Sequence, residues 1–156
     1  MIIDVKPIEF RKLTVEFVSP LMDFLHALEE TGDDKRFHPH PFTIETVRAL
    51  AIHAGKDLYY VLTEGNAVIG YAMLRGWDEG YEIPSLGISI HPLARKRGWG
   101  ILFIHFLHAV AHRHGAKKVR LRVSANNKEA IQLYNKLGYE FQPIEENGYL
   151  VAYYSL

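Results

Sequence analysis

Residues 95–100 form the segment of this chain best suited to hold an anion. The run Arg95-Lys96-Arg97-Gly98-Trp99-Gly100 combines three adjacent cations with two closely spaced glycines. An apolar stretch that predicts a strand precedes it, and an amphipathic stretch that predicts a helix follows it. The first N–H groups of a helix have no partner within the helix, and the helix dipole favours negative charge there. Glycine lets backbone N–H groups approach a bulky phosphate. We therefore expect a phosphate-bearing ligand at this segment, called the phosphate loop below.

A second patterned segment follows further along the chain, Asn127-Lys-Glu-Ala130-Ile-Gln-Leu133-Tyr134-Asn-Lys-Leu-Gly138-Tyr139. In this order, the two segments resemble the GNAT acetyltransferase superfamily. Its pyrophosphate loop reads Arg/Gln-x-x-Gly-x-Gly/Ala, and its later motif reads Asn-x-x-Ala-x-x-Leu-Tyr-x-x-x-Gly-Phe/Tyr. The phosphate loop alone would fit a strand-to-helix turn with solvated cations better than a ligand site, but the second motif reverses that preference. The resemblance is sharp from about residue 86 to residue 141 and only topological before that.

The resemblance implies that the ligand is acetyl-CoA. Its pyrophosphate would lie on the backbone N–H groups at the start of the helix, while the strand before the loop would offer its backbone to the pantetheine arm and the thioester carbonyl. The motif asparagine contacts the same arm in the family, and a helix N-cap role is compatible with that contact. The cofactor-binding residues implied in this way are Ile88, Ser89, Ile90, Arg95, Lys96, Arg97, Gly98, Trp99, Gly100, Ile101 and Asn127.

Tyr134 and Glu82 are the candidate catalytic residues. Tyr134 falls on the family tyrosine that faces the cofactor sulfur, so the resemblance implies that its phenol, of ordinary pKa near 10, hydrogen-bonds to or protonates the departing thiolate. The alternative is a tyrosine that only packs.

An alkylamine with a pKa of about 10.4 must lose a proton before it attacks, which costs roughly 4 kcal/mol at neutral pH. Glu82, on a strand predicted from Tyr81 to Ile90, is our first choice of base. Asp78 and Glu79 are alternatives, and a surface turn would explain all three.

Arg122 marks a departure from one branch of the family. The ribosomal-protein N-terminal acetyltransferases carry a glutamate five residues before the motif asparagine, where this chain has Arg122. The departure argues against a peptide N-terminus as the acceptor. Two roles stay open for Arg122 itself: a solvated cation at the sheet edge, which we favour, or a site for an anionic acceptor.

The predicted acceptor site lies at an unusual loop, Arg36-Phe37-His38-Pro39-His40-Pro41. In the family fold the region between the first two helices borders the acceptor, and two prolines stiffen this loop. Phe37, His38 and His40 are therefore candidate acceptor-binding residues, and Trp77 and Tyr81 are candidate walls of the same cleft. A proline-rich connector with exposed histidines, and burial of the two aromatic rings in the core, are equally open.

The favoured function is acetyl transfer from acetyl-CoA to a small polar primary amine, such as an amino sugar, by direct attack in a ternary complex. A protein N-terminus or lysine as acceptor is the first alternative. A non-catalytic acyl-CoA-binding or sensing domain is the second, and a nucleic-acid module that uses residues 95–97 is the third. The 18 basic and 18 acidic residues cancel, which argues against nucleic-acid binding.

Composition narrows the remaining possibilities. The chain has 156 residues, 48% of them hydrophobic and 23% charged, which suits a single domain spanning residues 1–156. It has no cysteine, so an acyl-cysteine intermediate and thiolate metal sites are excluded. His105, His108 and His112 are predicted to share a solvated helix face rather than to bind a metal. With no apolar run of membrane-spanning length and no signal-peptide pattern, we expect a cytoplasmic protein without a membrane partner. Its oligomeric state stays open, a homodimer included.

The pattern of elements predicts an α/β (α+β) fold in the order β-α-α-β-β-β-α-β-α-β-β, as in a GNAT domain. It has about seven strands in one mixed sheet and about four flanking helices. The predicted strands are Ile8–Leu13, Leu58–Thr63, Ala67–Gly76, Tyr81–Ile90, Lys118–Ser124, Tyr139–Pro143 and Tyr149–Tyr154. The predicted helices run from Ser19 as N-cap to Glu30, from Thr43 as N-cap to His53, from Gly100 to His114 and from Asn127 to Leu137.

Overall fold

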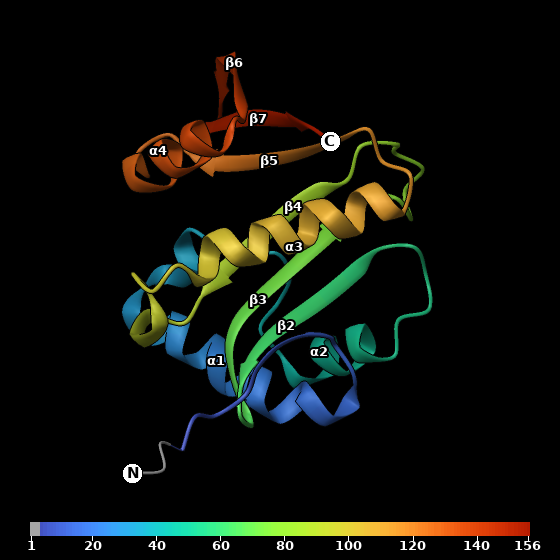
Figure 1. The fold of residues 1–156 in the computed structure, drawn as a ribbon, viewed down its shortest axis with the longest axis vertical. Helices are drawn as coiled ribbons and strands as arrows, with labels where there is room; N and C mark the ends of the chain where they lie inside the picture. Colours follow the sequence, from blue (N-terminus) through green and yellow to red (C-terminus); the bar gives the residue numbers. More distant parts are fainter. Residues whose placement is uncertain (1–3) are drawn as a thin grey trace.

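The protein is one seven-stranded sheet with helices on both faces, in a computed structural model that describes residues 4–156 (Figure 1). The predicted order of strands and helices is confirmed. The strands are β1 (Ile8–Lys12), β2 (Leu58–Glu64), β3 (Ala67–Arg75), β4 (Ser85–Ile90), β5 (Lys118–Ser124), β6 (Glu140–Glu146) and β7 (Tyr149–Ser155). The α-helices are α1 (Val18–Thr31), α2 (Ile44–Ala51), α3 (Trp99–Arg113) and α4 (Lys128–Leu137).

The two halves of the sheet meet at a single point. The strand order is β1-β2-β3-β4-β5-β7-β6, and every neighbouring pair is antiparallel except β4 and β5. These two strands run parallel because α3 carries the chain across between them, and they register at only one pair, Ser85 with Arg120. Beyond that pair they diverge, as Figure 1 shows. We call this opening the fork; its sides are residues 86–90 of β4 and residues 121–124 of β5.

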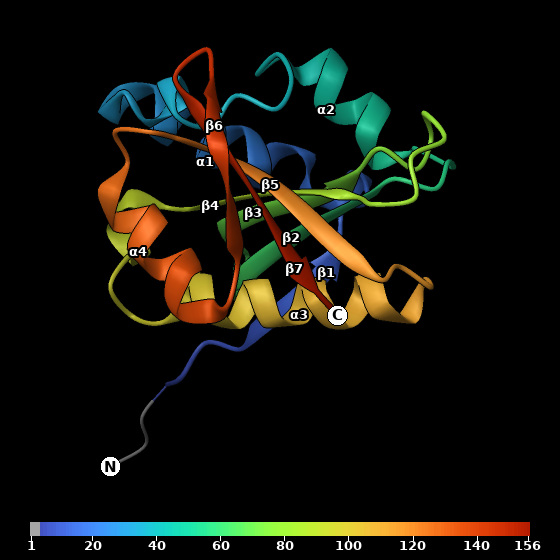
Figure 2. The same ribbon diagram turned by 90° about the horizontal axis from the view of Figure 1, so that it is seen from above.

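Two hydrophobic cores hold the sheet from opposite sides (Figure 2). One face packs on α1 and α2, and the other on α3. Because β3 lies between both layers, its side chains are buried on both faces, which explains its continuous apolar sequence. The α1 core includes Leu21, Phe24, Leu28, Tyr71 and Met73, and the α3 core includes Leu62, Leu74, Leu86, Phe103, Leu107 and Leu121. Within residues 4–156 no helix has the length and apolarity to cross a membrane.

Most predicted helix ends are confirmed. Thr43 accepts a hydrogen bond from the Thr46 N–H at the start of α2 (3.2 Å), and Asn127 accepts one from the Ala130 N–H at the start of α4 (3.4 Å). Gly138 ends α4 with φ of 98°, a conformation that glycine adopts readily. The predicted N-cap at Ser19 is wrong. A short 3₁₀ turn and then Val18 begin the helix earlier, because Phe17 and Val18 are buried and anchor its first turn.

The predicted start of the fourth strand is also wrong, because residues 76–84 form a loop. Buried Asp57, just before β2, accepts hydrogen bonds from the N–H groups of Gly76 (3.0 Å) and Asp78 (3.1 Å). These bonds fix the loop, within which the N–H of Tyr81 donates to the Gly76 carbonyl (3.0 Å) instead of joining a strand ladder, and Pro84 has no N–H to donate. Glu82, predicted to begin the strand, lies in this loop.

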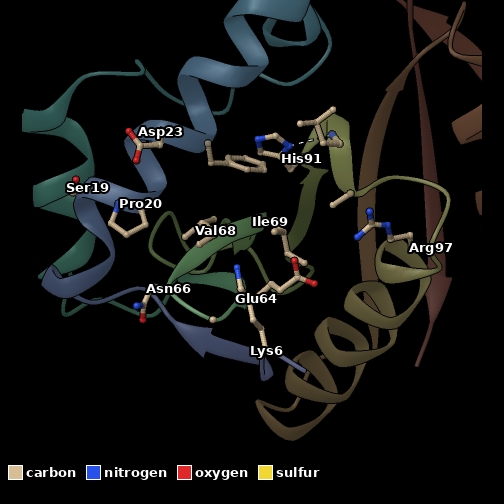
Figure 3. A pocket seen from close by; sticks show the side chains of 15 residues that line it. Lys6, Ser19, Pro20, Asp23, Glu64, Asn66, Val68, Ile69, His91 and Arg97 are labelled. Atoms are coloured by element: carbon tan, nitrogen blue, oxygen red, sulfur yellow. Dashed lines mark hydrogen bonds between the residues drawn. The ribbon is translucent and has the colours of Figure 1, made fainter. Parts of the chain in front are cut away.

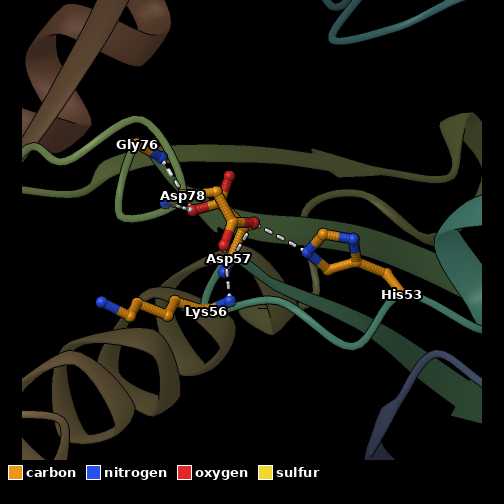
Figure 4. A network of polar contacts seen from close by, with 5 residues as sticks. All are labelled: His53, Lys56, Asp57, Gly76 and Asp78. Carbon is orange, nitrogen blue, oxygen red and sulfur yellow. Dashed lines mark hydrogen bonds and ion pairs between the residues drawn. The ribbon is translucent and has the colours of Figure 1, made fainter.

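Asp78 completes the network that fixes the loop (Figure 4). Its carboxylate accepts hydrogen bonds from the N–H groups of Lys56 (2.7 Å) and Asp57 (3.2 Å) and pairs with His53 Nε2 (2.8 Å). The bond from Lys56, followed by those from Asp57 and His53, outweighs desolvation and lowers the Asp78 pKa. All of these bonds hold the loop in place. The contacts of Asp78 therefore fit a structural role rather than that of a base.

The histidine stripe on α3 is only partly solvated, which corrects the sequence prediction. His105 and His112 are exposed, but His108 is 8% exposed. Its Nε2 lies 2.6 Å from the Tyr139 hydroxyl, and its ring stacks on Tyr154 at 4.2 Å. The segment after α4 and strand β7 thus cover this side of the helix. Desolvation, with a smaller effect from the neighbouring His105, lowers the His108 pKa to about 4. Within residues 4–156, no three His, Asp or Glu side chains form a metal-binding group.

The buried His108 should make folding pH-dependent. The unfolded chain takes up a proton near the ordinary histidine pKa of 6.5, whereas the folded protein does so only near pH 4. Because the unfolded state binds more protons in this window, His108 should lower the free energy of unfolding by up to about 3 kcal/mol as the pH falls from 6.5 to 4. Urea unfolding of His108→Gln should show a shallower loss over this range than wild type. His112→Gln, at an exposed position one turn later, should retain the wild-type slope; equal slopes for all three proteins would contradict the assignment.

Candidate functional site

The phosphate loop has the backbone geometry of an anion site. It follows β4 through a short turn, Pro92–Ala94, and leads directly into α3, with Gly98 as the helix N-cap. Lys96 and Gly98 both have positive φ, 62° and 84°. Left-handed residues that alternate with others turn successive N–H groups toward one concave surface. The loop therefore presents backbone donors and the positive end of the α3 dipole together.

The two glycines of the loop serve different purposes. Gly98 has open space around it, so its positive φ is what requires glycine there. Gly100 lies inside the first turn of α3, and a Cβ added there would meet Ile90 Cγ1 at 3.8 Å, an ordinary van der Waals contact. Alanine therefore fits at Gly100 but is strained at Gly98, in agreement with the Gly and Gly/Ala positions of the sequence pattern.

Arg95 braces the loop from within. Its Nε donates to the Ile90 carbonyl (3.1 Å), and its Nη2 lies 3.2 Å from Asp33 Oδ2, just after α1. Partial burial pushes the Asp33 pKa upward, but hydrogen bonds from Thr31 and Arg95 and the charges of Arg95 and Arg36 outweigh this effect and lower it. Asp33 stays ionised and tethers the loop to α1. No pattern in the sequence pointed to Asp33, because its partner lies far away along the chain.

Lys96 and Arg97 have exposed side chains beside the same loop. Trp99, at the first position of α3, has its indole N–H buried without a protein acceptor. The loop thus offers two exposed cations in addition to its backbone donors.

The fork leaves one edge of β4 without a strand partner beyond Ser85. Ile88 and Ile90 pack their side chains on the α3 core, so Gly87 and Ser89 take the opposite face. Residues 88–90 are half-buried. Because the edge that faces β5 lacks ladder bonds, its backbone groups are suited to an extended ligand that lies along the strand like another strand. The phosphate loop is at the end of this edge.

Tyr134 lies on α4, on the α3 side of the sheet. It packs against the α3 core, and its ring meets the Tyr139 ring at 5.4 Å. Desolvation raises the pKa of Tyr134 to about 12. Its phenol is therefore protonated at neutral pH and can donate a hydrogen bond. It is a weaker acid than a thiol of ordinary pKa about 8.5, so full proton transfer to a thiolate would be uphill by about 5 kcal/mol.

The proline-rich loop covers the α1 face of β3 and β4. Phe37 lies in the α1 core, 3.8 Å from a Cβ built at Gly87. His40 has partners on both ring nitrogens: Nε2 lies 2.9 Å from the Tyr71 hydroxyl and Nδ1 lies 2.8 Å from the Pro41 carbonyl. Burial raises the Tyr71 pKa, so Tyr71 donates to Nε2 and His40 donates from Nδ1. His40 is thus a neutral, fully bonded residue, whereas His38 is exposed against Phe42.

Trp77 does not share a cleft with this loop, which corrects the prediction. Trp77 packs on the α3 core, on the opposite face of the sheet from Phe37, with its ring 5.7 Å from His114. Together with Glu82 it lines a pocket of about 590 Å³ near the end of α3. Tyr81 is 64% exposed and lies beside Gly76 in the same loop. The aromatic rings and the histidines were grouped by sequence reasoning, but the sheet separates Trp77 from them.

A larger pocket, which sequence reasoning missed, adjoins the phosphate loop on the side of α1 (Figure 3). It measures about 850 Å³ and lies between the start of α1, the turn between β2 and β3, and the residues after β4. Arg97 and His91 form part of its wall, with Asp23, Glu64 and Lys6 on other sides. His91 Nδ1 accepts the Leu93 N–H (3.1 Å), and desolvation together with Arg95 lowers the His91 pKa. The pocket thus has mixed charge.

Comparisons with solved structures show the same fold. The GNAT domain of PAT from S. lividans is 16% identical, with a TM-score of 0.80, over 94% of this chain and 89% of that one. The PaiA N-acetyltransferase from Thermoplasma acidophilum, in complex with coenzyme A, is 14% identical, with a TM-score of 0.80, over 96% and 99%. A chimera of the spermidine N-acetyltransferase SpeG from Vibrio cholerae and hSSAT is 17% identical, with a TM-score of 0.73, over 95% and 94%. No curated protein matches the chain.

A family comparison agrees with the site geometry. The model of the Acetyltransferase (GNAT) family matches residues 22–139, a range that includes most of α1 and all of the fork, the phosphate loop and α4. The resemblance inferred from two short motifs is thereby confirmed over most of the chain: the protein belongs to the GNAT acetyltransferase family.

Proposed function

We propose that the protein transfers the acetyl group of acetyl-CoA to the primary amine of a small polar molecule, such as an amino sugar. The observation that carries the proposal is the continuity of the phosphate loop with the free edge of β4, which gives a pyrophosphate and an extended arm adjoining places to bind. The coenzyme A complex of a protein with the same fold supports it. The amine nitrogen attacks the thioester carbon, the C–S bond breaks, and the products are an amide and coenzyme A.

Different residues of the chain have different roles in this reaction. Backbone N–H groups at residues 97–101 hold the pyrophosphate, with Lys96 and Arg97 adding positive charge, while Arg95 keeps the loop in shape. A backbone N–H of residues 88–90 donates to the thioester oxygen as it gains charge, an interaction typically worth about 100- to 1000-fold in rate. Asn127 begins α4 and borders the pantetheine arm. Tyr134 donates a hydrogen bond to the departing sulfur.

Thiol release from acetyl-CoA by the purified protein tests the proposal directly. Amino sugars, nucleotide amino sugars, polyamines, amino acids and short peptides serve as acceptors. Release with a small polar amine is the expected result. Release only with peptides would favour a protein acetyltransferase, and acetyl-CoA binding without release from any acceptor would favour a sensing domain.

Substitutions at Gly98 should separate backbone strain from charge in cofactor binding. Gly98→Ala places a side chain at φ of 84°, which costs about 1–2 kcal/mol and should weaken acetyl-CoA binding by roughly 5- to 30-fold. Gly98→Asn tolerates this conformation and should stay near wild type, whereas Gly98→Glu should abolish binding because its carboxylate faces the pyrophosphate. Calorimetric titration measures each affinity. Gly115→Ala, at φ of 87° beyond the other end of α3, should reduce stability without changing the affinity. Wild-type affinity in Gly98→Glu would refute the cofactor site.

Removal of the Tyr134 hydroxyl should slow turnover without loosening the cofactor. A hydrogen bond to a charged sulfur contributes about 1.5–3 kcal/mol, so Tyr134→Phe should lower kcat by about 10- to 100-fold. The acetyl-CoA dissociation constant should change little, because the bond forms in the transition state. Tyr60→Phe, at a tyrosine that packs on Phe106, is the control and should retain wild-type kcat. An unchanged kcat in Tyr134→Phe would remove this residue from the reaction.

Glu82 is our proposed base, acting through water. It lies in the loop that leads to Ser85, where β4 and β5 join, and it lines the pocket beside Trp77. Glu82→Gln should lower kcat/KM by about 100-fold at neutral pH, a typical contribution of general base catalysis, and the loss should shrink as the pH approaches the amine pKa. Glu79→Gln in the same loop serves as the control. A pH–rate profile of Glu82→Gln that overlays the wild-type profile would exclude the role.

A further inference from the structure

Two arginines stand side by side on β5, next to the fork. Arg120 and Arg122 are two residues apart on one strand, so their side chains share a face of the sheet. Leu121 and Val123 point the other way, into the α3 core. Arg120 Nη1 donates to Ser85 Oγ (3.1 Å), and the Arg122 guanidinium lies over the Tyr149 ring at 4.5 Å from its centre. Both side chains are therefore held by neutral groups.

Neither guanidinium has an ion-pair partner among residues 4–156. The acids nearest in the register of this face are on β6: Glu140 opposite Tyr153, and Glu146 opposite Tyr149. Strand β7 lies between β6 and β5, so the backbones of these glutamates and of the arginines are separated by about 10 Å in the sheet plane. Lys118 adds another cation to the same face of β5. The two arginines beside the fork thus carry positive charge that no ion pair among residues 4–156 neutralises.

The register places Arg122 beside the middle of the fork. Ser85 pairs with Arg120, so two residues further along both strands Gly87 is level with Arg122 across the opening. Gly87 presents its face toward Phe37, on the α1 side of the sheet. Trp99, at the start of α3, and Tyr134 pack on the α3 side. An acceptor that enters from the α1 side would therefore meet Phe37 and Arg122 before it meets a thioester bound along β4.

Resting on the function proposed above, we propose that the acceptor amine carries a carboxylate or phosphate group, and that Arg122 and Arg120 bind this group beside the fork. A planar guanidinium offers paired N–H donors that match both anions, and the Tyr149 ring leaves the edges of Arg122 free to donate. The same cations disfavour an ammonium nearby and so help the amine to lose its proton before it attacks. A polycation such as spermidine, the substrate named for the SpeG chimera, would be repelled here.

Matched acceptors test the proposal. Glucosamine 6-phosphate is compared with glucosamine, and β-alanine with its amide, by thiol release from acetyl-CoA. One anionic member should exceed its neutral partner in kcat/KM by about 10- to 100-fold, as charge-assisted hydrogen bonds predict. Arg122→Gln should remove that preference, leave the rate with the neutral member within about 2-fold, and leave acetyl-CoA affinity unchanged. Lys118→Gln removes one charge from the same face, away from the fork, and should retain the preference. Equal rates within both pairs, or better rates with spermidine, would overturn the proposal.

A second measurement does not depend on turnover. With coenzyme A present to fill the phosphate loop, inorganic phosphate is titrated while the Nε–H signals of the arginines are followed by NMR. A saturable shift of the Arg122 signal, absent from the exposed Arg113, would support the anion site even if no acceptor released thiol, in which case only the proposed function would fail. No saturable shift at Arg122 would overturn the inference whatever the activity.

Discussion

β4 and β5 share a single registered residue pair, and the arrangement of the site depends on that constraint. A strand in the middle of a sheet ordinarily satisfies its backbone on both sides. Here residues 86–90 of β4 have a strand partner on the β3 side only. The gap persists although the α3 core packs on both strands, because each strand is held by a full antiparallel ladder on its other side: β4 by β3, and β5 by β7. A ligand that lies along the free edge supplies the bonds that a neighbouring strand would otherwise make.

The same constraint explains why the two faces of the fork differ in character. On the α3 side, the crossover helix must begin where β4 ends, which brings its positive N-terminus to the mouth of the fork. On the α1 side, alternation along the strands leaves small residues on β4, Gly87 and Ser89, opposite large cations on β5. One strand therefore serves two ligands, a phosphate-bearing one through its backbone and its end, and another through the side chains across from it.

Local patterns were enough to predict the elements, and they failed where a distant residue decided the outcome. The caps at Thr43 and Asn127 and the glycine end of α4 follow from neighbours within a few residues, so they could be predicted. The start of β4 could not, because the distant Asp57 fixes a loop through the N–H groups of Gly76 and Asp78, and within that loop Tyr81 donates to the Gly76 carbonyl instead of to a strand. His108 shares a helical stripe with exposed residues and yet is buried, because Tyr139 and Tyr154 return to cover it. Trp77 was grouped with the proline-rich loop because a sequence does not show which face of a sheet a residue takes after a turn.

The arginines show why composition could not reveal the charge of the site. With 18 basic and 18 acidic residues, the formal net charge of the chain is zero. The role of each arginine depends on whether a carboxylate lies beside it. Arg95 is neutralised by Asp33 and bonded to Ile90, so it shapes the phosphate loop. Arg120 and Arg122 are held by a hydroxyl and an aromatic ring, which fix their positions while leaving their charge uncompensated. Two like charges fixed on one strand repel each other, and an anion between them relieves that repulsion. Uncompensated cations beside a free strand edge therefore indicate what the fork admits more directly than the total charge of the chain.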